Sequence, residues 1–137
     1  MSLRVGLDLV SAETVRESLQ RHGPRYLHRV YTEREVADCR TEHGADARRL
    51  AARFAVKEAT FKVLRVGKDD AVPWTAVEVR RHPPHGVSVV LTGRAAELAQ
   101  AAGIRELAVS LTHEKGRAAA VVVAEIQESA GTQVVVP

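Results

Sequence analysis

Four charged side chains lie close together in one stretch of the sequence, at Arg53, Lys57, Glu58 and Lys62. Positions 53 and 57 are four residues apart, as are positions 58 and 62, so helical spacing would place each pair on one side of a helix. Such a mostly positive face can bind nucleotides, phosphates or an acidic protein. The plainer alternative is a solvated helix side with one Glu–Lys pair, worth about 0.3 kcal/mol.

Two further polar residues, Asp8 and His113, interrupt or end apolar strand patterns. Asp8 alternates with Leu7 and Leu9, so it is expected to face away from the apolar side of its strand. His113 follows an apolar run and precedes a turn, where a sheet presents functional groups to solvent. Taken alone, each residue is equally well explained as an ordinary surface residue, and neither specifies a reaction.

The elements that must position these residues change in type along the chain. Helices are predicted over residues 12–21, 26–31, from the capping box at Thr32–Glu35 to Gly44, over 46–64 and over 93–102. Strands are predicted over residues 3–10, 77–79, 87–91, 107–111 and 118–124. Because helices come early and strands late, we expect an α+β domain with helices packed on one face of a mostly antiparallel sheet.

Length and composition limit the possible classes of protein. The 137 residues favour one domain, over 1–126, with a tail over 127–137 that carries no helical pattern and is free to fray. A single cysteine, Cys39, excludes a disulfide framework and a multi-cysteine zinc site. The chain lacks a signal-peptide pattern and a long apolar span, so a cytoplasmic protein without membrane association is expected. The net charge of +3 is too small to indicate nucleic acid by itself.

Three motifs follow one another along the chain: Gly6-Leu7-Asp8, the R-F-x-x-K-E-A-x-x-K stretch from Arg53 to Lys62, and Ser110 to His113. In this order and spacing they resemble the holo-(acyl carrier protein) synthase family of 4′-phosphopantetheinyl transferases, and the middle motif is the most specific. The segments 26–35 and 74–79 support the match, which covers about residues 5–125. The resemblance implies the fold of a short, single-lobe phosphopantetheinyl transferase.

The resemblance also implies a reaction and a metal. The family transfers the 4′-phosphopantetheine arm of coenzyme A to a serine of apo acyl carrier protein and releases adenosine 3′,5′-bisphosphate. By resemblance, Asp8 and Glu58 are Mg²⁺ ligands, which suits a hard cation that prefers oxygen. Glu58 would also take the serine proton, and Lys62 would meet the phosphate that is attacked.

Further contacts with substrates follow from the same match. Arg53 and His113 correspond to positions that contact the 3′-phosphate of the coenzyme, and Lys57 is expected to contact a phosphate or the nucleotide. One lobe offers little to enclose a coenzyme, so a homotrimer with active sites at subunit interfaces is expected by analogy. Arg21 and Arg25 are the favoured cations for docking the acidic carrier protein.

Some alternatives stay open. A catalytically silent docking subunit and a basic module that binds polyanions are the competing hypotheses, although no aromatic stacking platform favours nucleic acid. The sequence departs from the family pattern at Ser11, at Arg65-Val66 and at Val87-Ser88, which leaves the metal and nucleotide contacts of those positions undefined. Whether a fatty-acid or a polyketide carrier protein is modified is also open.

Overall fold

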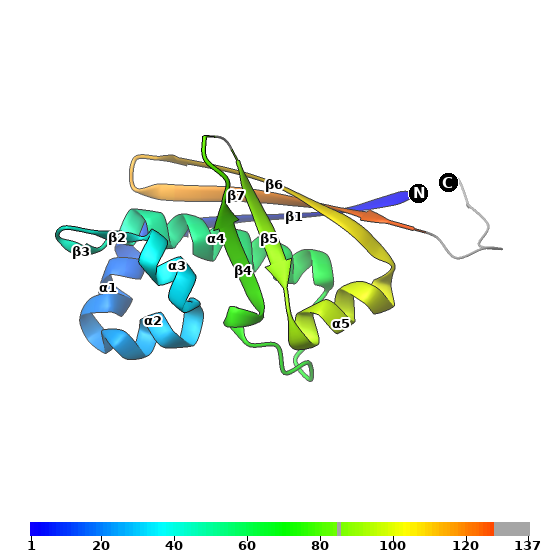
Figure 1. Cartoon of the computed structure of the whole chain (residues 1–137), viewed down its shortest axis with the longest axis horizontal. Helices are drawn as coiled ribbons and strands as arrows, with labels where there is room; N and C mark the ends of the chain where they lie inside the picture. The colour runs from blue at the N-terminus through cyan, green and yellow to red at the C-terminus, as the bar shows by residue number, and fades with distance from the viewer. Residues whose placement is uncertain (85, 128–137) are drawn as a thin grey trace.

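One long helix, α4 (Ala47–Leu64), lies along a three-stranded sheet and forms the centre of the structure (Figure 1). The computed structural model describes residues 1–84 and 86–127, so residues 128–137 of the expected tail lie outside the described part. The α+β class is confirmed, with helices against antiparallel strands.

The remaining elements follow in a simple order. They are β1 (Ser2–Ser11), α1 (Ala12–His22), α2 (Pro24–Val30), α3 (Glu33–Asp38), β2 (Arg40–Thr41), β3 (Gly44–Ala45), the 3₁₀ turn η1 (Trp74–Ala76), β4 (Val77–Arg81), β5 (Val87–Leu91), α5 (Gly93–Ala102), β6 (Ile104–Glu114) and β7 (Arg117–Ile126). The third helix is shorter than predicted, because the chain turns at Cys39 and then forms the small β2–β3 hairpin, which includes Gly44, instead of continuing the helix.

The sheet has the strand order β1-β7-β6, with both pairs antiparallel. Side chains alternate between its faces, and the face toward α4 carries Gly6, Asp8 and Val10 from β1. The apolar residues of β1 are on the other face, where Leu3, Val5, Leu7 and Leu9 are each 60–64% exposed. The strand therefore presents its polar residue to the helix and its large apolar residues outward.

Close approach of α4 to β1 depends on Gly6. A Cβ atom at this position would lie 2.1 Å from the backbone oxygen of Ala59, which is far inside van der Waals contact. The missing side chain lets the helix settle directly on the strand. This contact lies two residues before Asp8 and one residue after Glu58, and so it brings the two acidic residues together.

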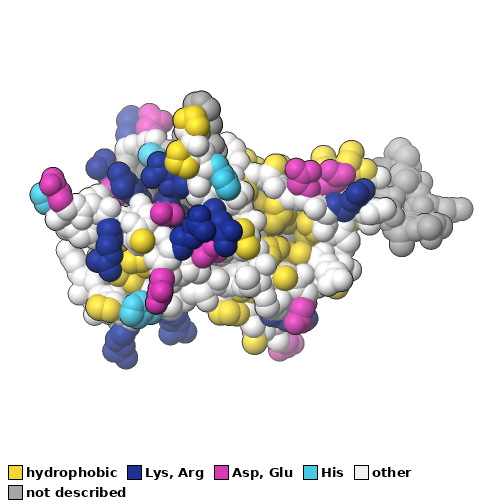
Figure 2. Space-filling view, in the orientation of Figure 1, with side chains coloured by type: hydrophobic (Ala, Val, Ile, Leu, Met, Phe, Trp, Pro, Cys, Tyr) yellow, Lys and Arg dark blue, Asp and Glu magenta, His cyan; other side chains and the backbone are white. Residues whose placement is uncertain are grey.

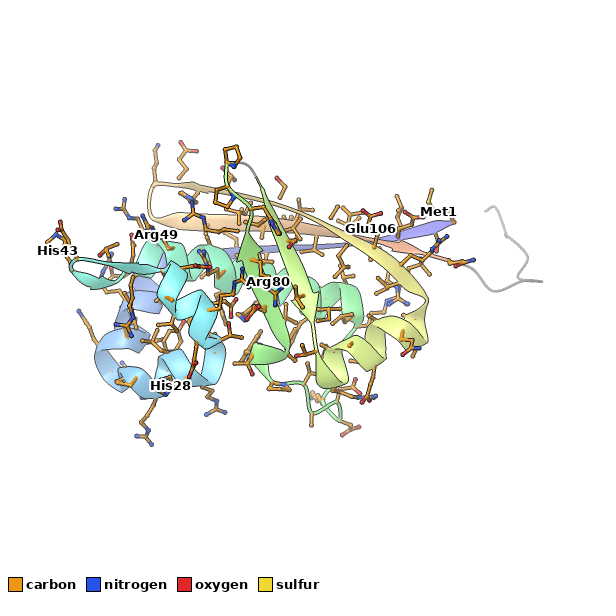
Figure 3. The ribbon with its side chains drawn as sticks, viewed as in Figure 1. Met1, His28, His43, Arg49, Arg80 and Glu106 are labelled. Atoms are coloured by element: carbon orange, nitrogen blue, oxygen red, sulfur yellow. The ribbon has the colours of Figure 1, made fainter. Side chains whose placement is uncertain are left out.

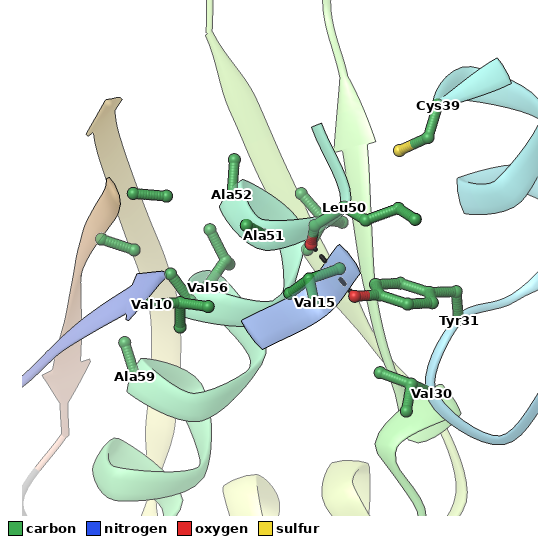
Figure 4. Packing of buried hydrophobic residues seen from close by; sticks show 14 of the residues in the cluster. Val10, Val15, Val30, Tyr31, Cys39, Leu50, Ala51, Ala52, Val56 and Ala59 are labelled. Atoms are coloured by element: carbon green, nitrogen blue, oxygen red, sulfur yellow. Dashed lines mark hydrogen bonds between the residues drawn. The ribbon is translucent and has the colours of Figure 1, made fainter. Parts of the chain in front are cut away.

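The helix α4 is enclosed on nearly all sides because many of its residues are small. Five alanines of the helix, with Leu50 and Val56, are buried in a core shared with β1 and β7. Figure 4 shows this core, in which the Tyr31 hydroxyl donates to the Leu50 carbonyl at 3.2 Å. The enclosure also buries Arg53 and Lys57, so the plainer alternative of a solvated helix side does not hold for these two residues.

Candidate active site

Asp8, Glu58 and Lys62 come together where β1 passes under α4. The Nζ of Lys62 donates to the Leu7 carbonyl at 2.7 Å and to Asp8 Oδ1 at 3.1 Å. Glu58 lies one helical turn before Lys62 and beside the Asp8 carboxylate. The structure thus brings these three candidate residues together, two from the helix and one from the strand.

The two carboxylates share a restricted environment. Burial raises the pKa of Glu58, the adjacent Asp8 raises it further, and only Lys62 opposes these effects. The Asp8 side chain is 12% exposed, and its buried Oδ2 has no hydrogen-bond partner among the described residues. Two neighbouring carboxylates with an unpartnered oxygen fit a hard divalent cation, which would relieve both the desolvation and the repulsion.

The protein alone offers few ligands for such an ion. Within the described ranges, no group of three or more His, Cys, Asp or Glu residues is placed to hold a metal. Mg²⁺ commonly keeps several waters and takes only one or two carboxylates together with substrate phosphates. The donor set at Asp8 and Glu58 therefore fits a metal that is completed by a phosphate-bearing substrate.

A pocket of about 280 Å³ opens beside this cluster. It is lined by Glu58, Phe61, Lys62, Arg65, Val66 and Trp74. The ring of Trp74 stacks on Phe61 with centroids 4.5 Å apart and an interplanar angle of 9°. The pocket therefore has an aromatic wall on one side and the charged residues of α4 on the other.

Lys57 has a different role from the one predicted. Its side chain is fully buried, and Nζ donates to Glu35 Oε1 at 2.8 Å, to the Trp74 carbonyl at 3.1 Å and to the Val77 carbonyl. All three donors of the ammonium group are thus used inside the protein. No exposed surface is left for a phosphate, so the expected nucleotide contact does not fit this geometry.

Arg53 is buried but incompletely bonded. Its Nη1 donates to the Arg49 carbonyl at 3.3 Å, while Nε and Nη2 have no partner among the residues described. A buried guanidinium with free donors is costly unless an anion completes it. The geometry is therefore compatible with the expected phosphate contact.

His113 is separated from the acidic cluster within one chain. It lies near the end of β6 opposite Ala118 and lines a second cavity of about 140 Å³ together with Arg48 and Arg117. This cavity shares no lining residue with the one beside Glu58. The single chain therefore does not bring His113 and Glu58 into one site.

The two predicted docking residues are exposed. Arg21 lies in the last turn of α1 and Arg25 in the first turn of α2, and neither forms an ion pair with any residue that the structure describes. His28 on α2 and His43 in the β2–β3 turn are also exposed and lie at the outer edge of the molecule (Figure 3).

Sequence reasoning missed two residues around the site. Glu35 was recognised only as part of a capping box, yet its carboxylate is also the buried partner of Lys57 and accepts from the Val79 amide at 2.9 Å. Arg65 was noted only as a departure from a pattern, yet it lines the pocket beside Glu58. The sequence did contain a signal for Glu35. A glutamate and a lysine that both lie beside predicted apolar segments can form a buried ion pair.

The chain is similar in sequence to known proteins of one superfamily. The sequence model described as the 4′-phosphopantetheinyl transferase superfamily matches residues 4–122. A holo-(acyl-carrier-protein) synthase of Koribacter versatilis is 38% identical over 91% of this chain and 99% of the relative. The corresponding synthase of Moorella thermoacetica is 41% identical over 90% of this chain and 94% of the relative.

Solved structures agree with the sequence match. A Chronobacterium ammoniagenes synthase in complex with coenzyme A has a TM-score of 0.81 and 30% identity, covering 93% of this chain and all of that one. The Helicobacter pylori synthase with coenzyme A has a TM-score of 0.76 and 26% identity, covering 89% of this chain and all of that one. The fold and site thus define a phosphopantetheinyl transferase, and the chain belongs to the holo-(acyl-carrier-protein) synthase family of that superfamily. None of the described helices is long and apolar enough to cross a membrane.

Proposed function

We propose that the chain transfers the 4′-phosphopantetheine arm of coenzyme A to a serine of apo acyl carrier protein, with Mg²⁺, and releases adenosine 3′,5′-bisphosphate. The observation that carries this proposal is the adjacency of Asp8, Glu58 and Lys62 in a member of this family. The coenzyme A complexes of two relatives add support for the co-substrate.

Each residue of the cluster has a distinct task in the proposed reaction. Asp8 and Glu58 would hold Mg²⁺, which when bound would neutralise phosphate charge at the reacting bond. Glu58, whose raised pKa makes its carboxylate a stronger base than an ordinary glutamate, is suited to accept the serine proton. Lys62 is 54% exposed and can turn its ammonium toward a phosphate that replaces Asp8 as its partner. Arg53 and His113 would hold the 3′-phosphate.

The decisive experiment is the modification itself. Purified chain is incubated with apo acyl carrier protein, coenzyme A and Mg²⁺, and the carrier is weighed by intact mass spectrometry. We expect the carrier to gain one phosphopantetheine arm. Retained binding of the carrier without a mass gain would instead support a silent docking subunit. Binding of nucleic acid, with no carrier binding and no mass gain, would support a polyanion module.

The active enzyme is proposed to be a homotrimer. An apolar stripe on β1 (Leu3, Val5, Leu7 and Leu9) is exposed in the single chain, which is unusual for a surface that stays in water. In addition, His113 lies away from Glu58 within one chain, so a neighbouring copy could bring the two together. Both observations favour active sites that are completed at subunit interfaces.

We expect Val5→Glu to break the trimer. The change places a charge in the middle of the apolar stripe, where burial against a second copy would leave the carboxylate unpaired. Sedimentation should show a smaller species, and transfer activity should fall with it. Gln100→Glu, an exposed change on α5, is the control and should leave both unchanged. An active monomeric wild type would refute the trimer.

Arg21 and Arg25 are proposed to dock the acidic carrier protein. Figure 2 shows Lys and Arg side chains gathered over the half of the molecule that carries α1, α2 and α3. Replacing both residues with Glu should raise the KM for the carrier roughly 10-fold, because steering and rim contacts are reversed in sign. The affinity for coenzyme A, measured by calorimetry, should stay the same. Equal damage to both substrates would refute this assignment. Arg105→Glu, a charge reversal at an exposed position on β6, is the control for a change of surface charge elsewhere.

A further inference from the structure

Arg65 ends the helix α4 in a backbone conformation that a side chain disfavours. Its φ and ψ are 55° and 48°, the left-handed region. The Arg65 amide donates to the Lys62 carbonyl and the Val66 amide to the Phe61 carbonyl, both at 3.2 Å, which is the pattern of a Schellman cap. Glycine would close the helix in the same way without strain, so the cap does not require an arginine.

The side chain of Arg65 lies at the pocket beside Glu58. It lines the cavity together with Lys62 and Trp74, and it is exposed. In the described part of the chain, no carboxylate lies within ion-pair distance of its guanidinium, whereas Lys62 is already engaged by Asp8. Arg65 can therefore receive an incoming anion without first giving up a carboxylate partner, whereas Lys62 must leave Asp8 to do so.

The chemistry of the group indicates which anion it receives. A guanidinium presents a planar fork of donors that matches two oxygens of a phosphate, while an ammonium acts as a point charge. The pocket also contains Glu58 and Lys62, the residues expected nearest to the reacting phosphate. A carboxylate of the carrier protein is the other possible partner, but sharing the cavity with the reacting groups favours the coenzyme.

We propose that Arg65 is a coenzyme-binding residue that contacts the pyrophosphate of coenzyme A through its guanidinium. This assignment rests on the proposed function, because it requires coenzyme A in the pocket of Glu58. It gives the strained arginine a task that a capping glycine could not perform, since the contact holds the pyrophosphate beside Lys62.

The test is calorimetric binding of coenzyme A in the presence of Mg²⁺ and without carrier protein. Arg65→Gly should bind about 10-fold more weakly, as expected for the loss of charge-assisted hydrogen bonds at an exposed site. Its thermal midpoint should be no lower than that of the wild type, because glycine suits the left-handed conformation. Arg65→Lys should recover only part of the affinity, because an ammonium keeps the charge but not the planar fork of donors. Lys68→Ala, which removes an exposed cation outside the pocket, should change nothing.

A second ligand separates the phosphate groups. 3′-Dephospho-coenzyme A keeps the pyrophosphate but lacks the 3′-phosphate, so Arg65→Gly should weaken its binding by the same factor. A loss seen only with intact coenzyme A would overturn the pyrophosphate contact. Unchanged coenzyme affinity with a raised KM for the carrier would show that Arg65 docks the carrier and would also overturn it. A wild-type chain that binds no coenzyme A contradicts the proposed function itself, so the two failures are distinguishable.

Discussion

Glu58→Gln is expected to reduce transfer by about 10³-fold or more, while the protein stays folded and keeps the oligomeric state of the wild type. The amide keeps the size of the side chain but cannot accept the serine proton, and it is a weaker ligand for a hard cation. In the absence of metal, the variant should be at least as stable as the wild type, because it removes a carboxylate that is partly buried beside Asp8.

This prediction is measured in two ways. Transfer is followed by the mass of the carrier protein, and metal binding by the rise in thermal midpoint on adding Mg²⁺. Mg²⁺ should stabilise the wild type and leave Glu58→Gln nearly unchanged. Glu106→Gln, at an exposed position on β6 (Figure 3), is the matched control and should behave as the wild type in both assays. Near-normal turnover of Glu58→Gln would contradict the metal and base assignments.

Lys57→Met is expected to lower the free energy of unfolding by about 3–5 kcal/mol, since it breaks a fully buried ion pair and leaves one charge unpaired. Glu35 would keep only the Thr32 and Val79 amides as donors. The Val77 carbonyl would lose its lysine donor, while the Trp74 carbonyl would keep the Val77 amide. Because Lys57 also holds the Trp74 backbone, the aromatic wall of the pocket should loosen.

Urea unfolding provides the measurement, and the same helix provides the control. Lys62→Met removes a lysine whose own side chain is 54% exposed, although its partner Asp8 is mostly buried, and it should cost only about 1 kcal/mol. A Lys57→Met variant as stable as Lys62→Met would mean that the buried pair contributes little. The double variant Glu35→Leu, Lys57→Met should lose less than the sum of the single changes, because no unpaired charge remains.

Much of the fold could be predicted from local patterns. The alternation at β1, the capping box at Thr32 and Glu35, and the long helix after Asp46 were each visible in the sequence and are confirmed. The end of α3 was not, since the β2–β3 hairpin depends on pairing of only two residues on each strand. Such a short pairing leaves no periodic pattern to detect.

The site was harder to predict where burial decides the role of a charge. Helical spacing predicted that Glu58 and Lys62 lie on one side of the helix. It could not show that Lys57, on the same helix, is buried in the core. Alanines make a helix weakly amphipathic, so the sequence does not indicate which side faces solvent. The buried ion-pair partner of Lys57 is Glu35, which is 22 residues away in sequence, so the pairing is visible only in the structure.

The two faces of β1 have a consequence for insertions and deletions. Because consecutive side chains point to opposite faces of the sheet, adding or removing one residue near Leu7 would move each following side chain of the strand to the opposite face. The Asp8 carboxylate would then lie on the outer, apolar face of the strand, and a leucine side chain would lie beside Glu58. Inserting or deleting one residue in this strand should therefore be tolerated far less well than the same change in the turn at Lys115 and Gly116, which leaves the alternation of side chains along β1 intact.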